Sequence, residues 1–300
     1  MELTNTKKIM LFKEQVIEKL LALCAYLSIF TTIGIISVLC FETIDFFKIV
    51  SFREFFLGTR WEPLLVPQTF GILPLLSGTL IIVIGSALIS IPMGVLTAVY
   101  LSQFASKKTR NIIKPILEIL AGIPTVVYGF FALTFVTPTI RIFFESTEIF
   151  NAASGCIVVG IMILPMVASL CDDALNAIPK DLKQGGYALG TTSYEVIKGI
   201  MIPAGFSGII ASFVLAISRA FGETMAVTLA AGATPKIALN PLEGIQTMTA
   251  YIVQVSLGDT PAGGIEYLTI FAVASLLFLV TFSMNIFSNF IMNRYREEYE

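Results

Sequence analysis

Two charged residues, Arg219 and Glu223, lie in an otherwise uncharged segment, 204–234. A charge at the centre of a membrane span costs several kcal/mol, from about 3 to more than 10, so it usually faces a bundle interior or a solute path. In a continuous helix the four-residue spacing places both side chains on one face, one turn apart. The pattern predicts an anion path in which Glu223 holds the guanidinium of Arg219 between substrates.

The residue types at this site fit a phosphate-like anion. A guanidinium is always charged, and its donors match the oxygens of phosphate bidentately. Ser218 and Thr224 lie beside the pair and add hydroxyl donors. The alternative is that Arg219 and Glu223 form a structural ion pair within the span. Buried ion pairs contribute little net stability, which favours the path over the structural pair.

Composition places the chain in a membrane and argues against several functions. Of 300 residues, 56% are hydrophobic and 13% charged, with a mean hydropathy of +0.85, whereas soluble domains average about 25% charged. There is no histidine, so imidazole metal sites and histidine-activated nucleophiles are excluded. We predict no catalytic residue, no metal and no enzyme activity in this chain. The net charge of −2, without a basic stripe, argues against nucleic acid.

The apolar segments predict an all-α membrane protein with about six transmembrane helices embedded in lipid. About 20 residues suffice to span a bilayer. We predict an N-terminal tail, 1–19, a single transmembrane domain, 20–300, and a first span that is retained rather than cleaved. Pro92, Pro124 and Pro165 are expected to kink their helices. The predicted spans are about 20–41, 72–101, 119–140, 149–171, 205–233 and 267–291.

Six spans place both termini on one side of the membrane. The segments on that side carry most of the lysine and arginine, including Lys7, Lys8, Lys107 and Lys108. Positively charged segments remain cytoplasmic. We therefore expect a multi-pass protein with both termini, and the segment 172–203, in the cytoplasm.

The segment 172–203 is patterned as two helices with a break between them. Pro179 suits the first turn of a helix, and Gly190 suits a left-handed helix end. Thr191 to Ser193 can cap a second helix, with Glu195 near its first turn. Pro203 is expected to stop that helix. The pattern predicts a helical hairpin at the cytoplasmic surface.

This hairpin resembles the coupling loop of ABC-importer permeases, whose form is Glu-Ala-Ala, then Gly, then Ile-x-Leu-Pro. The matching residues are Gln184-Gly185-Gly186, Gly190 and Ile200-Met201-Ile202-Pro203, with Gln in place of Glu and glycines in place of alanines. The resemblance implies a type I ABC-importer permease fold. It also implies that a separate ATP-hydrolysing subunit receives this loop. The residues implied in that contact are Gln184, Gly185, Gly186, Gly190, Glu195 and Pro203.

The chain lacks the Gly-x-x-x-x-Gly-Lys-Ser/Thr phosphate loop of ATP-binding proteins. We therefore expect no cofactor in this chain, with ATP and Mg bound by the partner ATPase subunit.

Further segments resemble the permeases of the Pst phosphate importer, over roughly residues 40–295. They include 70–80, 92–95, 100–105 and 114–129, and the run 219–227 resembles the C-type permease. This resemblance implies a bacterial inner-membrane permease for inorganic phosphate. The partners it implies are a second homologous permease, two ATP-binding subunits and an extracytoplasmic phosphate-binding protein.

Two other functions stay open. One is a permease for another oxyanion, sulfate or molybdate. The other is a secondary transporter or channel, which would need internal repeats with broken helices, and we find no duplicated half in the sequence.

Overall fold

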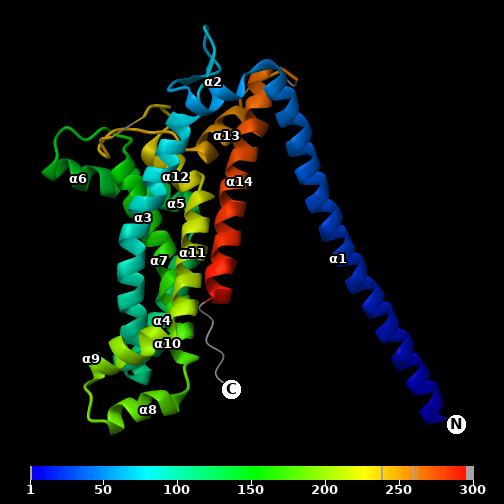
Figure 1. Ribbon diagram of the computed structural model, residues 1–300, viewed down its shortest axis with the longest axis vertical. Helices are drawn as coiled ribbons and strands as arrows, with labels where there is room; N and C mark the ends of the chain where they lie inside the picture. The colour runs from blue at the N-terminus through cyan, green and yellow to red at the C-terminus, as the bar shows by residue number, and fades with distance from the viewer. Residues whose placement is uncertain (1, 238, 259, 262, 295–300) are drawn as a thin grey trace.

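The computed structural model describes residues 2–237, 239–258, 260–261 and 263–294, and these are almost entirely helical (Figure 1). The all-α prediction is confirmed, with one two-stranded antiparallel pair in which Trp61 faces Phe70. The elements are α1 (Glu2–Ile49), α2 (Phe52–Leu57), β1 (Trp61–Glu62), β2 (Thr69–Phe70), α3 (Leu73–Val99), the π-helical η1 (Tyr100–Phe104), α4 (Lys107–Gly122), α5 (Thr125–Phe131), the π-helical η2 (Ala132–Val136), α6 (Thr137–Phe143), α7 (Ala152–Asn176), α8 (Lys180–Ala188), α9 (Ser193–Val196), the π-helical η3 (Ile197–Met201), α10 (Ile202–Ala204), α11 (Phe206–Phe221), α12 (Met225–Ala231), α13 (Met248–Ser256) and α14 (Ile265–Arg294).

Five helices in the described residues are long and apolar enough to cross a membrane, and a bent pair of helices adds a sixth. The bent pair joins Ser193–Ala204 to Phe206–Phe221 at an angle of 71°. The five single helices are Lys13–Ile49, Leu73–Phe104, Thr125–Phe143, Ala152–Asn176 and Ile265–Met292.

Helix α1 diverges from the rest of the bundle and leaves its apolar side chains exposed (Figure 1). It meets α14 near its C-terminal end, where the Thr43 hydroxyl lies 2.7 Å from that of Ser275. Phe46 is fully buried there, among Phe55 and Phe70. The start of α1 and the end of α14 point to the same end of the bundle as α8 and α9 (Figure 1). We call this the hairpin end.

Helices α3 and α7 form the centre of the bundle, because small residues let their backbones approach closely. A Cβ added at Gly94 of α3 would lie 2.6 Å from Val167 Cγ1 of α7. Pro92 and Pro165 lie inside these two helices, as expected of kink positions. At the end opposite the hairpin, Trp61 packs edge to face against Tyr251 of α13, with ring centroids 5.0 Å apart.

Several span boundaries differ from the sequence prediction. The first candidate span is Lys13–Ile49 rather than 20–41, and the predicted tail, 1–19, is part of helix α1 from Glu2 onward. The third span does not start at residue 119: helix α4 ends at Gly122, and Pro124 is the N-cap of α5 rather than a kink. The residue before a proline disfavours helical geometry, and Ile123 is extended, with ψ 130°. The fourth span does not end at residue 171, because α7 continues to Asn176 and carries Asp172 and Asp173 within the helix.

Candidate functional site

Arg219 lies in the last turn of α11, and its side chain is exposed. The buried residues of α11 are Ile209, Ser212, Ala216, Ala220 and Phe221, and the first four recur at helical spacing along one face. Arg219 lies off that face. Among the described residues, no ion pair or hydrogen bond joins its side chain to another group. The chain therefore presents a guanidinium whose donors are free for a group from outside it.

The predicted pairing of Arg219 with Glu223 does not form. The prediction of one continuous helix over 205–233 was wrong, because α11 ends at Phe221 and α12 begins at Met225. Glu223 lies in the break and is buried, with 8% of its surface exposed. Its Oε1 accepts from the backbone N–H of Ala226 at 3.3 Å, and its backbone oxygen accepts from the Thr249 hydroxyl at 2.7 Å. Glu223 thus stabilises the start of α12 instead of neutralising Arg219.

The two predicted hydroxyl donors differ in their surroundings. Thr224 donates its hydroxyl to the backbone oxygen of Gly222 at 3.1 Å, within the break. The Ser218 hydroxyl points to Oδ1 of Asn285 on α14, at 3.5 Å. Asn285 was not anticipated, although an amide inside the apolar run of α14 was a signal available in the sequence. The structure thus brings Ser218, Arg219 and Asn285 to neighbouring positions on α11 and α14.

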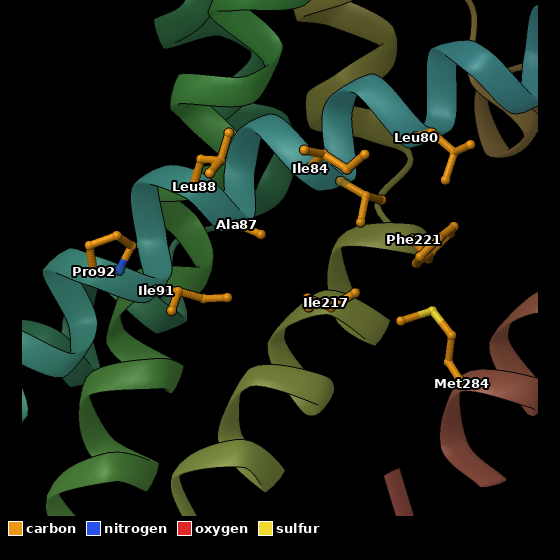
Figure 2. Close-up of a pocket in the computed structure, with 10 residues that line it drawn as sticks. Leu80, Ile84, Ala87, Leu88, Ile91, Pro92, Ile217, Phe221 and Met284 are labelled. Atoms are coloured by element: carbon orange, nitrogen blue, oxygen red, sulfur yellow. The ribbon is translucent and has the colours of Figure 1, made fainter. Parts of the chain in front are cut away.

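An apolar groove of about 450 Å³ lies between α3, α11 and α14 (Figure 2). Ile217 and Phe221 of α11, Met284 of α14 and Leu80 of α3 line it, together with other apolar residues. Ile217 and Phe221 are two positions before and after Arg219, so Arg219 points to another side of α11. An unpaired polar group is costly in such surroundings. This groove is therefore not the anion site.

The hairpin formed by residues 180–204 agrees with its predicted pattern at three points. Helix α8 starts after Pro179. Gly190 has φ +79°, the left-handed geometry that favours glycine. Thr192 and Glu195 form a capping box at the start of α9, in which Glu195 Oε2 accepts from the Thr192 backbone N–H at 2.8 Å.

The glycines of the hairpin serve different purposes. Gly186 is buried where α8 meets the second half of the hairpin, and a Cβ there would lie 2.6 Å from Ile200 Cδ1. A Cβ at Gly185 would meet nothing within 4 Å. Gln184 is exposed on α8, as is Glu195 on α9. These exposed side chains give the hairpin a polar outer surface.

The hairpin is continuous with the helix that carries Arg219. The second helix runs through η3 and α10, ends at Ala204, one residue after Pro203, and turns at Gly205, so the predicted stop is confirmed to within one residue. Proline is tolerated in a first helical turn, and here it is at the start of α10. Helix α11 follows directly and, at 1.5 Å per residue, extends about 24 Å. A single bent element therefore connects the hairpin to Arg219.

The bundle of up to six spans and the glycine-broken helical hairpin at one end agree with the predicted ABC-importer permease fold. Residues 90–297 match the family described as "Binding-protein-dependent transport system inner membrane component", and the chain belongs to this family.

Relatives extend the match over most of the chain. The "Probable ABC transporter permease protein YqgH" of Bacillus subtilis (strain 168) is 32% identical over 273 residues, which cover 90% of this chain and 88% of the relative. The "Phosphate transport system permease protein PstC" of Mesorhizobium japonicum is 30% identical over 260 residues, covering 80% and 78%.

Solved structures share the fold. A chain of a bacterial alginate ABC transporter, in complex with its alginate-bound periplasmic protein, superimposes with a TM-score of 0.64 at 16% identity, covering 92% of this chain and 94% of that chain. A chain of the inward-facing MetNI methionine ABC transporter gives a TM-score of 0.56 at 16% identity, covering 76% and 95%. The predicted type I permease fold is confirmed.

Proposed function

We propose that this chain is a permease subunit of an ATP-driven importer of inorganic phosphate. It forms the translocation path with a second homologous permease. Two ATP-binding subunits hold ATP and Mg, and an extracytoplasmic phosphate-binding protein delivers the substrate. The complex lies in the bacterial cytoplasmic membrane, with both termini of this chain and the hairpin on the cytoplasmic side. The relatives named as phosphate permeases support this choice of substrate.

The observation that carries the proposal is the unpaired guanidinium of Arg219 in a membrane-spanning helix. A charge there is costly, and within the described part of the chain no ion pair neutralises it. Phosphate carries one to two negative charges and accepts bidentate hydrogen bonds from a guanidinium. Arg219 therefore lowers the barrier for phosphate as the anion passes, and a single cation does so without trapping it.

The hairpin supplies the connection to ATP hydrolysis. Its exposed polar surface, including Gln184 and Glu195, contacts the ATP-binding subunit. Movement of that subunit displaces the hairpin, and the bent element through Gly205 passes the displacement to α11. Arg219, in the last turn of α11, then changes its surroundings in step with ATP hydrolysis. Transport thus requires both the hairpin and the arginine.

The proposal is tested by expressing this chain with its partner subunits in cells that lack their own phosphate importer. We expect saturable uptake of radiolabelled phosphate that excess sulfate or molybdate does not compete away. Uptake of labelled sulfate or molybdate in preference to phosphate would instead identify a permease for another oxyanion.

A further inference from the structure

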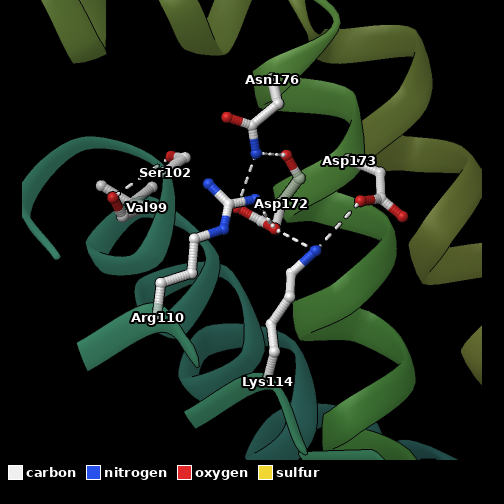
Figure 3. A network of polar contacts seen from close by, with 7 residues as sticks. All are labelled: Val99, Ser102, Arg110, Lys114, Asp172, Asp173 and Asn176. Carbon is white, nitrogen blue, oxygen red and sulfur yellow. Dashed lines mark hydrogen bonds and ion pairs between the residues drawn. The ribbon is translucent and has the colours of Figure 1, made fainter. Parts of the chain in front are cut away.

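An ionic cluster around a buried carboxylate joins α4 to α7 near the hairpin end of the bundle (Figure 3). Asp172 of α7 is completely buried, and its Oδ2 accepts from Arg110 Nη2 at 2.8 Å and lies 3.0 Å from Lys114 Nζ. Its Oδ1 accepts from the side-chain amide of Asn176 at 2.8 Å. Lys114 also lies 3.6 Å from Asp173. Two cations from one helix therefore converge on a single carboxylate of another.

The cluster lies between a helix that leads to the hairpin and a helix that leads to α5. Helix α7 ends at Asn176, and after a short connection the chain enters α8 of the hairpin. Helix α4 leads in the other direction, to α5 through the turn at Pro124. The Tyr128 hydroxyl of α5 donates to the backbone oxygen of Leu120 in α4 at 2.8 Å, which fastens that turn. A displacement of α7 that carries α4 with it therefore reaches α5.

Helix α5 in turn packs against the region around Arg219. It lies against α12, where a Cβ added at Gly129 would lie 2.7 Å from Leu229 Cβ. Helix α12 begins directly after Glu223 and the break that follows α11. The hairpin is thus connected at both of its ends to the break that follows α11: through α11 itself, and through α7, which packs against α5 and α12 directly and is also joined to α5 by way of α4.

The charges and burial of this cluster favour a rigid connection between α4 and α7. A buried ion cluster is a weak source of stability, because desolvation offsets much of the attraction. Separating its members, however, leaves an uncompensated charge in a buried place, so the two helices resist parting. Charge-assisted bonds with several donors also restrict geometry more tightly than apolar contact does.

We propose that Asp172, Arg110 and Lys114 are positioning residues for transport, which hold α4 to α7 so that hairpin movement reaches α5 and α12. This inference rests on the proposed function, because it requires the hairpin to be driven by ATP hydrolysis. None of these three residues lies on the hairpin or on α11, because they belong to α4 and α7. Loss of the cluster should therefore separate the two activities, leaving ATP hydrolysis in place while transport fails.

The test uses the complete complex in proteoliposomes, with ATP hydrolysis and phosphate uptake measured on the same preparation. We expect Asp172→Asn to assemble and hydrolyse ATP, while phosphate transported per ATP falls by at least about tenfold, the scale of a lost coupling of this kind. The exchanged pair Arg110→Asp with Asp172→Arg keeps opposite charges at both positions and should recover most of the ratio. Lys108→Gln is the matched control, since Lys108 is exposed on α4 and has no ion pair within the described residues.

A normal ratio in Asp172→Asn would overturn the inference while the proposed function stands. If Asp172→Asn does not assemble, Arg110→Gln and Lys114→Gln each leave the carboxylate one cation. Both variants should also lower the amount of phosphate transported per ATP. If ATP hydrolysis and phosphate uptake instead fall in parallel, the cluster only stabilises the fold and the inference is wrong. A wild-type complex that neither hydrolyses ATP nor accumulates phosphate would overturn the proposed function itself.

Discussion

At position 219 a guanidinium lies in the second half of the bent candidate span, and no residue that the structure describes pairs with it. The neighbouring carboxylate, Glu223, is instead buried at the start of α12 and accepts from the Ala226 N–H. The two residues that looked like an ion pair in sequence therefore have separate tasks. We propose that Arg219 is the residue available to an anion, whereas Glu223 lies in the break that ends α11. Substitutions at the two positions should have different consequences.

Arg219→Gln should abolish phosphate uptake while the complex still assembles. Glutamine is polar and of similar reach, but it has no charge to stabilise the anion, and loss of such a group costs about 100-fold or more in rate. Arg219→Lys is the matched control: it keeps the charge without the bidentate donors, so an intermediate rate is expected. Uptake in proteoliposomes, with assembly checked by co-purification, measures the effect. Normal phosphate uptake by Arg219→Gln would show that Arg219 does not stabilise the transported anion.

Glu223→Ala should lower the stability of the chain, because the first turn of α12 loses its acceptor. Loss of a capping interaction costs about 1 kcal/mol, and the change is measured as a lower Tm of the purified chain in detergent. Glu223→Gln keeps an acceptor oxygen and should retain most of the stability and most of the uptake. If Glu223→Gln stopped uptake with an unchanged Tm, Glu223 would belong to the anion path after all.

At the scale of elements, the sequence predicts features that neighbouring residues determine, such as helix ends. It does not predict features that depend on contacts between distant helices. Gly190 and the Thr192–Glu195 capping box act within a few residues, so the helix ends they form could be predicted. Asp172 was read as a loop residue because its counter-charges, Arg110 and Lys114, come from a distant helix. The sequence does not predict the break after Phe221, because the apolar residues on either side of it are also typical of a continuous span. The break is held by the contacts of Glu223 with Ala226 and Thr249.

Gly190→Val should disrupt the hairpin. The backbone there has φ +79°, which is strained for a β-branched residue and costs about 1–3 kcal/mol. Gly190→Asn is the control, since asparagine tolerates this geometry. We expect Gly190→Val to co-purify poorly with the ATP-binding subunit or to hydrolyse ATP without uptake, while Gly190→Asn remains close to wild type. Full uptake by the valine variant would argue that the hairpin geometry is unimportant.

At the scale of the whole molecule, the bundle has two distinct ends (Figure 1). The hairpin and the far ends of α1 and α14 lie at one end, and α2, α6 and α13 lie at the other. The spans could be counted from the sequence because apolar length alone reveals a membrane helix. Most described apolar side chains of α1, by contrast, are exposed, and we expect lipid or a partner subunit to cover them.

Cysteine labelling tests the proposed sidedness of these ends. In a chain without its native cysteines, Leu189→Cys marks the hairpin and Leu239→Cys marks the opposite end, both at well exposed positions, 84% and 97%. An impermeant thiol reagent added to intact cells should modify the cysteine at position 239 and reach position 189 only after permeabilisation. The reverse pattern would invert the topology.

The central claim is that this chain moves phosphate only as part of an ATP-driven complex. The most direct measurement compares proteoliposomes that contain both permeases alone with proteoliposomes that also contain the ATP-binding subunits, in the presence of the phosphate-binding protein. We predict accumulation of phosphate against its gradient only when the ATP-binding subunits are present and hydrolysing ATP. Phosphate flux through the permeases alone, unaffected by ATP, would contradict the account and identify a channel or secondary transporter.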